Sequence, residues 1–438
     1  MQPASGTEHR IALDPGVGKA YGDQGNRLPF PILPLTMPQM DTHERLSTLA
    51  RKMDWELRED ILPYWYQTMD HRNGGFAGLV STDGSLDLDA PKGVVMHSRH
   101  LWASSRAWLE RRNPLDLAAA RHAASFLMGP LYDPIDKGFW WTVDAQGHPE
   151  FENKVLYGQA FAVYGLSQYS RATGDKASLE RAVETFDLLE AAGRDKEFGG
   201  YYEAVDRGWT KTLVQALSNV DIPCAKSMNT NLHLLEAFSA LFLASGLPRV
   251  REALESLLQV FEKHILVTPE HLGLYFDRDW KNLTDHVSYG HDVEASWLMT
   301  EAAEILYGHG IPSSTKELCA RVARKSLAVI SDHGGSLPNE LHAGHLDTDR
   351  IWWVQAEAMV GLVNGWELTG DEAFLTAAES VWGYIERFLI DRLHGEWFWS
   401  VDAQGRPSLD RPKGGLWKTS YHNGRACLEV IRRARRCS

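Results

Sequence analysis

The chain contains two nearly identical stretches that decide its fold, FWWTVDAQGHP at Phe139–Pro149 and WFWSVDAQGRP at Trp397–Pro407. Each begins with aromatic and β-branched residues, and the shared VDAQG is typical of a turn between two short strands. Agreement this close between distant segments indicates an internal repeat. The hairpin is therefore one copy of a unit that recurs along the chain.

A weaker form of the same signal, a glycine followed in most copies by an aromatic residue, occurs six times. The glycines are Gly75, Gly138, Gly200, Gly273, Gly335 and Gly395, and the copy at Gly335 lacks the aromatic residue. Between successive copies, apolar residues recur at spacings of three and four, which predicts two helices per interval. We expect six helix pairs, each followed by a hairpin loop.

The segment IWWVQAEAMVGLV at Ile351–Val363 is apolar nearly all round, so a helix there needs partners on every side. This favours an all-α (α/α)6 barrel with short β-hairpin loops at one mouth over an open solenoid. Residues 39–438 are expected to form this single catalytic domain. Residues 1–38 are rich in glycine and proline and are expected to be a flexible N-terminal extension.

Composition limits the partners. The 438 residues hold 45 Lys and Arg against 58 Asp and Glu, a net charge of −13 without dense runs of one sign, so a nucleic-acid partner is not expected. The sequence shows neither a membrane-spanning apolar run nor a signal peptide, which favours a cytoplasmic protein without a membrane partner. We expect a monomer or a weak homodimer.

Chemistry-bearing residues gather in the expected first turns of the inner helices, which should meet at one mouth and form a pocket. The segments are HSRHLW (97–102), KVLYGQAF (154–161), KSMNTNLHLLEAF (226–238), SYGHDVEASWL (288–298), RIWWVQAEA (350–358) and LWKTSYHNGR (416–425).

Three histidines and one arginine point to proton transfer at this mouth. His291 and Glu294 are three residues apart, so the carboxylate could orient the imidazole. This spacing also occurs in metal sites, but His422 is followed three residues on by Arg425, so no metal is predicted. His233 and Arg99 complete a group that can take and give protons near neutral pH.

Tryptophan is abundant, with 16 residues. Most should pack in the core, but Trp297, Trp353 and Trp417 lie close in sequence to the polar residues, and Asn229 and Glu357 could bind hydroxyl groups. An indole face complements the C–H face of a pyranose, so a carbohydrate ligand is predicted. Two alternatives stay open: a glycoside hydrolase using Glu294 and Glu357, and a non-catalytic sugar-binding protein.

Five long phrases occur in order: HSRHLW, SMNTNLHLLEAF, SYGHDVEASWLM, WWVQAEAMVG and YHNGR. With them the chain resembles the N-acylglucosamine 2-epimerase superfamily from about Met40 to Ile431, and most closely its members that act on cellobiose. The resemblance implies the (α/α)6 barrel and, without metal or cofactor, epimerisation at C2 of the reducing-end glucose of β-1,4-linked disaccharides. A free-monosaccharide enzyme, either a mannose–fructose isomerase or a mannose/glucose 2-epimerase, is the alternative.

The resemblance also implies roles. His291 and His422 match an acid/base pair, His233 a third histidine near the reacting carbons, and Arg99 an arginine near the sugar oxygens. The positions that match binding or supporting residues are Tyr157, Asp221, Asn229, Glu294, Trp297, Trp353, Glu357 and Trp417. Thr419 and Ser420 depart from the Cys-Pro expected in some members, which concerns the shape of the loop before His422.

Overall fold

A computed structural model describes residues 41–436 except 219–220, and these described residues form one compact unit. The predicted N-terminal extension lies outside the described residues. No helix in the described part of the chain is long and apolar enough to cross a membrane.

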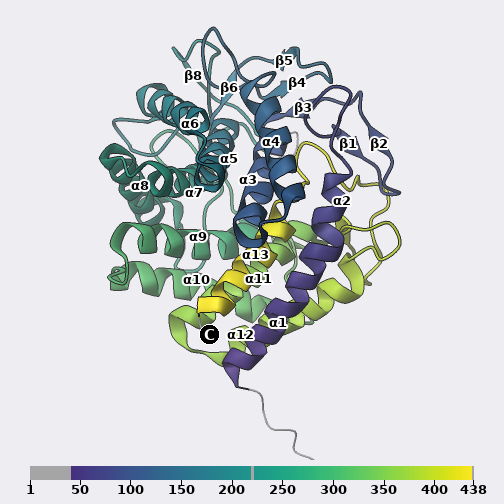
Figure 1. The fold of residues 1–438 in the computed structure, drawn as a ribbon. Helices are drawn as coiled ribbons and strands as arrows, with labels where there is room; N and C mark the ends of the chain where they lie inside the picture. Colours follow the sequence, from purple (N-terminus) through teal and green to yellow (C-terminus); the bar gives the residue numbers. More distant parts are fainter. Residues whose placement is uncertain (1–40, 219–220, 437–438) are drawn as a thin grey trace, which may run out of the picture. The chain divides into compact units, whose positions relative to one another are not determined.

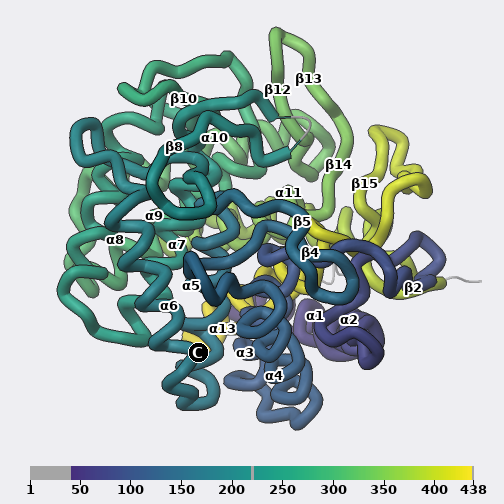
Figure 2. The backbone as a smooth tube through the Cα atoms, turned by 90° about the horizontal axis from the view of Figure 1, so that it is seen from above, coloured from purple at the N-terminus to yellow at the C-terminus, as the bar shows by residue number. Residues whose placement is uncertain are grey.

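Six inner helices follow one another around a ring, and each contacts the next (Figure 1, Figure 2). They are α3 (Val94–Arg111), α5 (Leu156–Thr173), α7 (Met228–Ser245), α9 (Tyr289–Tyr307), α11 (Trp352–Thr369) and α13 (His422–Arg436). The last of them, α13, contacts both α11 and α3 and so closes the ring. The predicted (α/α)6 barrel is confirmed.

Six outer helices pack behind the inner ones. They are α1 (Thr42–Glu56), α4 (Pro114–Met128), α6 (Lys176–Leu188), α8 (Pro248–Val260), α10 (Ser313–Asp332) and α12 (Glu372–Tyr384). Helix α1 continues through a π-helical turn, η1 (Leu57–Ile61), into α2 (Leu62–Tyr66), and π-helical turns also follow three other outer helices: η2 (Leu189–Gly193), η3 (Phe261–Ile265) and η4 (Ile385–Leu389). Because α1 packs on α13, the two ends of the described chain complete one helix pair.

The short strands lie at the N-terminal mouth of the inner helices. Each inner helix from α3 to α11 is preceded by a strand that pairs antiparallel with a strand of the following hairpin loop. The sheets are β1 (Leu79–Val80) with β2 (Leu86–Asp87); β3 (Lys92–Gly93), β4 (Thr142–Val143) and β5 (Pro149–Phe151); β6 (Lys154–Val155), β7 (Ala204–Val205) and β8 (Thr212–Leu213); β9 (Lys226–Ser227) with β10 (Tyr275–Phe276); β11 (Val287–Ser288), β12 (Glu340–His342) and β13 (His345–Asp347); and β14 (Arg350–Ile351) with β15 (Ser400–Val401). The predicted VDAQG turn joins β4 to β5.

Buried ion pairs tie the hairpins to the inner helices. A lysine before the inner helix binds an aspartate at the start of the hairpin loop, at 2.6–3.1 Å, in four repeats, and in three of them the lysine lies in the preceding strand. The pairs are Lys92–Asp70, Lys154–Asp133, Lys226–Asp195 and Lys413–Asp391. Since each lysine is at least 99% buried and paired, these contacts anchor the helix starts that carry the polar residues.

The fourth residue of five inner helices provides a second anchor, because its side chain binds the backbone of the adjacent hairpin. Phe76 donates its backbone N–H to His97 Nε2 at 3.1 Å, and Phe139 donates to Gln159 Oε1 at 2.8 Å. Asn231, Asp292 and Gln355 make the equivalent contact. His97 therefore has a structural role that Gln fills elsewhere in the same chain.

This equivalence leads to a prediction for His97→Gln. Burial lowers the pKa of His97 from 6.5 to about 3, so the unfolded chain binds a proton below pH 6.5 that the folded chain does not. Each such proton lowers the free energy of unfolding by about 1.4 kcal/mol per pH unit as the pH falls below 6.5. Urea unfolding between pH 6.5 and 5 measures how the free energy of unfolding depends on pH. For His97→Gln this dependence should be weaker than for the wild type, by about one bound proton. An unchanged slope would contradict the structural role of a neutral His97.

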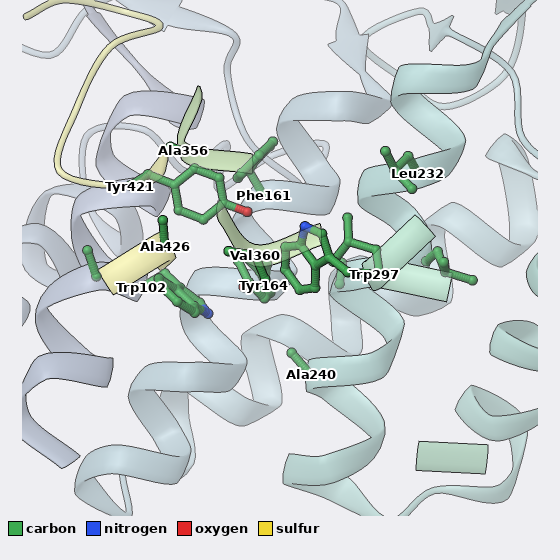
Figure 3. Close-up of a cluster of buried hydrophobic side chains, with 14 of the residues drawn as sticks. Trp102, Phe161, Tyr164, Leu232, Ala240, Trp297, Ala356, Val360, Tyr421 and Ala426 are labelled. Atoms are coloured by element: carbon green, nitrogen blue, oxygen red, sulfur yellow. The ribbon is translucent and has the colours of Figure 1, made fainter. Parts of the chain in front are cut away.

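Aromatic side chains fill the middle of the barrel (Figure 3). Trp102 stacks on Tyr164 at a ring-centroid distance of 5.3 Å, and the edge of Tyr421 meets both Trp102 and Phe161 at 5.5–5.6 Å. This layer separates the mouth formed by the N-terminal ends of the inner helices from the opposite mouth.

Candidate functional site

The register of the inner helices explains why polar residues meet near the barrel axis. Residues at equal positions along equivalent helices form layers. The sixth residues are Arg99, Phe161, His233, Glu294 and Glu357, and the second residues of α5, α7 and α11, one turn nearer the mouth, are Tyr157, Asn229 and Trp353. The predicted site residues on these helices thus belong largely to two neighbouring layers.

The three histidines share one arrangement, because each has its Nδ1 atom held by a neighbouring side chain. The partners are Glu236 Oε2 at 2.9 Å for His233, Ser288 Oγ at 2.8 Å for His291 and Glu357 Oε1 at 2.6 Å for His422. None of the three Nε2 atoms has a hydrogen-bond partner among the described residues. Each imidazole is therefore oriented through one nitrogen and has the other available for proton transfer.

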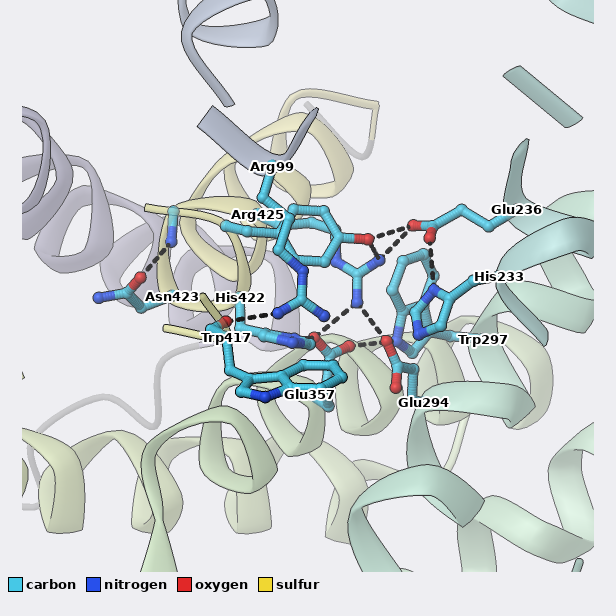
Figure 4. A network of polar contacts seen from close by, with 12 residues as sticks. Arg99, His233, Glu236, Glu294, Trp297, Glu357, Trp417, His422, Asn423 and Arg425 are labelled. Carbon is cyan, nitrogen blue, oxygen red and sulfur yellow. Dashed lines mark hydrogen bonds and ion pairs between the residues drawn. The ribbon is translucent and has the colours of Figure 1, made fainter. Parts of the chain in front are cut away.

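Arg425 is the centre of a buried network (Figure 4). Its guanidinium donates to Glu294 at 2.5 Å, to Glu357 at 2.6 Å and to Glu236, and it lies 4.8 Å from the ring centre of Trp297. Because Glu357 also holds His422 and Glu236 also holds His233, one fully buried arginine connects two of the three histidines.

Burial controls the protonation of these groups. It lowers the pKa of His291 to about 3 and that of His422 well below its ordinary value, so both imidazoles are neutral at pH 7. Burial and the nearby Glu357 raise the pKa of Glu294 to about 8. Burial alone would raise the pKa of Glu236, but Arg425 and His233 lower it to about 2. Glu236 is thus ionised at pH 7, whereas Glu294 holds a proton.

Arg99 connects further predicted site residues near His233. It is 3% exposed, donates to the Tyr157 hydroxyl at 3.0 Å and to the Trp417 carbonyl at 2.5 Å, and lies 4.6 Å from the ring centre of Phe161. Tyr157 in turn meets His233 edge-on at 5.1 Å. The structure therefore brings Arg99, Tyr157 and Trp417 beside His233.

Trp353 lies between the two histidines of the predicted acid/base pair. Its ring centre is 4.7 Å from that of His291 and 5.7 Å from that of His422. Trp353 and His291 are partly exposed, so this part of the network is open to solvent. Trp417 borders a small pocket of about 60 Å³ that is also lined by Trp141 and Leu217.

Two predicted binding residues lie outside the Arg425 network. Asp221 accepts hydrogen bonds from the hydroxyls of Tyr275 at 2.5 Å and Ser218 at 2.7 Å. Asn229 has a buried Oδ1 atom without a hydrogen-bond partner among the described residues. Asn229 thus carries an unused acceptor, while both oxygens of Asp221 are engaged by protein hydroxyls.

Two predictions need correction. Glu294 does not orient His291, because Ser288 holds His291 while Glu294 turns to Arg425. Trp297 does not present a free face to a ligand at this mouth: it is 1% exposed, and its indole N–H donates to Glu357 Oε2 at 3.0 Å. Trp297 is the ninth residue of α9, below the layer that holds Glu294, and there it supports Glu357.

The sequence reasoning missed Glu236 and Arg425 as site residues. A signal for Glu236 was present, since His233 and Glu236 repeat the spacing of His291 and Glu294. Of these two pairs, only His233 and Glu236 form an imidazole–carboxylate contact. Arg425 lies on α13, one turn after Tyr421 and three residues after the predicted site residue His422.

The arrangement fits proton transfer better than hydrolysis. Glu294 and Glu357 bind the same nitrogen of Arg425, and the ligating atoms of Glu294, Glu357 and His422 lie within 4.8 Å of one another. A hydrolase needs its two carboxylates on opposite sides of the scissile bond, with the sugar between them. Here a guanidinium lies between the two side chains and donates a hydrogen bond to each.

Comparisons with known proteins show which family the chain resembles. The family model of N-acylglucosamine 2-epimerase (GlcNAc 2-epimerase) matches residues 74–426. The cellobiose 2-epimerase of Dictyoglomus turgidum is 39% identical over 390 residues, which cover 89% of this chain and 99% of that protein. The solved cellobiose 2-epimerase of Spirochaeta thermophila is 46% identical with a TM-score of 0.86, and the match covers 90% of this chain and 98% of that chain. The D-mannose isomerase of Thermobifida fusca is 26% identical, and the match covers 80% of this chain and 85% of that protein.

Proposed function

The chain belongs to the N-acylglucosamine 2-epimerase family and is a sugar 2-epimerase of the isomerase class, and we propose that it epimerises C2 of the reducing-end glucose of β-1,4-linked disaccharides such as cellobiose. The observation that carries the proposal is the set of three histidines, each held at Nδ1 and open at Nε2. The identities of 39% and 46% to cellobiose 2-epimerases support a disaccharide, against 26% to a D-mannose isomerase.

The reaction begins with ring opening, since the C2 hydrogen is acidic only when C1 is an aldehyde. A proton then moves from C2 to one histidine, and the electron pair of the broken C–H bond passes through C1 to O1. Arg99 would stabilise the resulting cis-enediolate, and one such preorganised donor is typically worth about 3 to 4 kcal/mol. His233 would add a second donor when its Nε2 atom carries a proton, since its Nδ1 atom is engaged by Glu236. The pair Glu357–His422 suits proton uptake, because the carboxylate stabilises an imidazolium.

Inversion requires two acid/base groups. The histidine that takes the C2 proton would return it to the same face, so the second histidine must deliver a proton to the opposite face. His291 and His422, whose ring centres lie 4.7 Å and 5.7 Å from that of Trp353, are the proposed pair. Their neutral state at pH 7 allows either to act first as a base. The second histidine takes up a proton from water and gives it to C2, and the first returns the abstracted proton to water, so both are neutral again at the end of the cycle. The step needs no metal, since the charge is balanced by Arg99 and protonated imidazole.

A substrate panel tests the proposal. Cellobiose, lactose, mannobiose, glucose, mannose and N-acetylglucosamine are incubated separately with the protein, and the products are identified by chromatography and NMR. We expect cellobiose to yield glucosyl-mannose with a kcat/KM at least about tenfold above that for any monosaccharide. Conversion of mannose to fructose with no product from cellobiose would instead assign the free-monosaccharide alternative, and released glucose would indicate hydrolysis.

A further inference from the structure

The opposite mouth of the barrel contains a second cavity, of about 580 Å³. Its lining residues come from the middle and the C-terminal parts of α3, α5, α7 and α9 and from most of the length of α13. None of the three histidines lines it. Trp297, Glu236 and Arg425 line it and also belong to the network that holds His233 and His422 (Figure 4).

The layers of the inner helices continue into this cavity. The thirteenth residues include Arg106, Gln168 and Glu301, and the sixteenth residues include Arg171 and Glu304. The same register that gathers the catalytic side chains therefore gathers a second polar group one to three turns below them. Arg106, Glu301 and Glu304 are partly exposed and Arg171 is exposed, so the charged groups face the open cavity, whereas Gln168 is buried.

The carboxylates of the cavity are already paired with arginines. Glu429 binds Arg432 at 2.5 Å, and Glu301 lies 3.8 Å from the same guanidinium. Glu304 lies 3.8 Å from Arg436, and Glu236 binds Arg425. Acceptors in the wall are thus satisfied by the protein itself.

Some hydrogen-bond donors of the cavity, in contrast, have no acceptor among the described residues. Arg171 has no carboxylate within 4 Å among the described residues, and its one hydrogen bond is to Gln168 Oε1 at 3.4 Å. Gln168 is 3% exposed, and its Nε2 atom has no hydrogen-bond partner in the described part of the chain. The Nε atom of Arg425 is likewise buried and unpartnered. Burial and the nearby Arg106 charge also lower the pKa of Arg171.

Gln168 thus has a buried donor without a partner, and it lies beside the exposed Arg171, which has no carboxylate partner among the described residues. This pair suits a ligand that offers acceptors and negative charge. We infer that this cavity is a second ligand site, which binds the oxyanion group of a small molecule through Arg171 and Gln168. The cavity is larger than a phosphate ion, so there is room for an organic phosphate as well as for the inorganic ion.

Isothermal titration of the full-length protein with inorganic phosphate and with glucose 6-phosphate, against sodium chloride at matched ionic strength, tests the inference. We expect saturable binding that Arg171→Gln weakens at least about tenfold, since a charge-assisted hydrogen bond is worth about 1.5–3 kcal/mol. Gln168→Glu, which adds a carboxylate, should weaken it as well. Tighter binding of glucose 6-phosphate identifies an organic phosphate as the preferred ligand, and equal affinities identify the inorganic ion.

Arg321→Gln is the matched control, because Arg321 is an exposed arginine on α10 that binds only the Pro269 carbonyl and does not line the cavity. It should bind both probes like the wild type. Saturation absent for both probes, or affinities of Arg171→Gln equal to the wild type, would overturn the inference. Thermal unfolding of each variant confirms that the compared proteins are folded. Inorganic phosphate contains no sugar, so the result with that probe is independent of the proposed function.

Discussion

His422→Ala should lower kcat/KM for cellobiose by about 10³, since loss of a general acid/base typically costs 10² to 10⁴. The remaining histidine can still act alone on one epimer. In D2O we therefore expect this variant to exchange the C2 hydrogen of one disaccharide epimer without converting it, and His291→Ala to exchange that of the other epimer. Mass spectrometry of recovered cellobiose and glucosyl-mannose measures this directly.

His148→Ala is the control for this prediction. His148 also contacts a carboxylate, Asp144 at 2.9 Å, but it lies in the exposed turn between β4 and β5. Its removal should leave kcat/KM within about a factor of two. If His422→Ala and His291→Ala both kept activities within tenfold of the wild type, the proposed pair of acid/base groups would be wrong.

Arg425→Met should lower the free energy of unfolding by about 3–5 kcal/mol, because it removes the cation that compensates buried carboxylates. Glu236 and Glu357 would then lie in the barrel without an arginine partner, and the imidazoles they hold would lose their fixed orientation. Urea denaturation at pH 7 measures the loss, and kcat/KM should fall with it.

Glu294→Gln provides the matched comparison. Because Glu294 holds a proton at pH 7, with its pKa raised to about 8, an amide of the same shape replaces it without removing a charge. We expect a stability change below about 1 kcal/mol. A cost for Glu294→Gln as large as that for Arg425→Met would show that Glu294 is ionised and that the assigned charge balance is incorrect.

The barrel could be predicted because its repeat is marked by local signals. Turn residues such as those in VDAQG act over a few positions, and the apolar surface of Ile351–Val363 already requires neighbours on all sides. The buried ion pair between Lys92 and Asp70 could not be predicted in this way. The two residues are 22 positions apart, and isolated lysines and aspartates usually lie at the surface.

In the candidate site, too, some features could be predicted from local sequence and others could not. The histidines and Arg99 stood out because such residues are unusual in apolar inner helices. Their partners depended on which helices face each other: His422 on α13 is held by Glu357 on α11, 65 residues away, and no spacing within one helix reveals that contact. The expected pairing of His291 with Glu294 failed for this reason, since Arg425 on α13 competes for the glutamate.

The most direct test of the account is the reaction of the wild-type protein with cellobiose in D2O, followed by NMR of the product at C2. If the C2 proton is removed by one histidine and replaced from the other face, the glucosyl-mannose formed carries deuterium at C2. Glucosyl-mannose that retains the original hydrogen at C2 would contradict proton transfer by the His291–His422 pair.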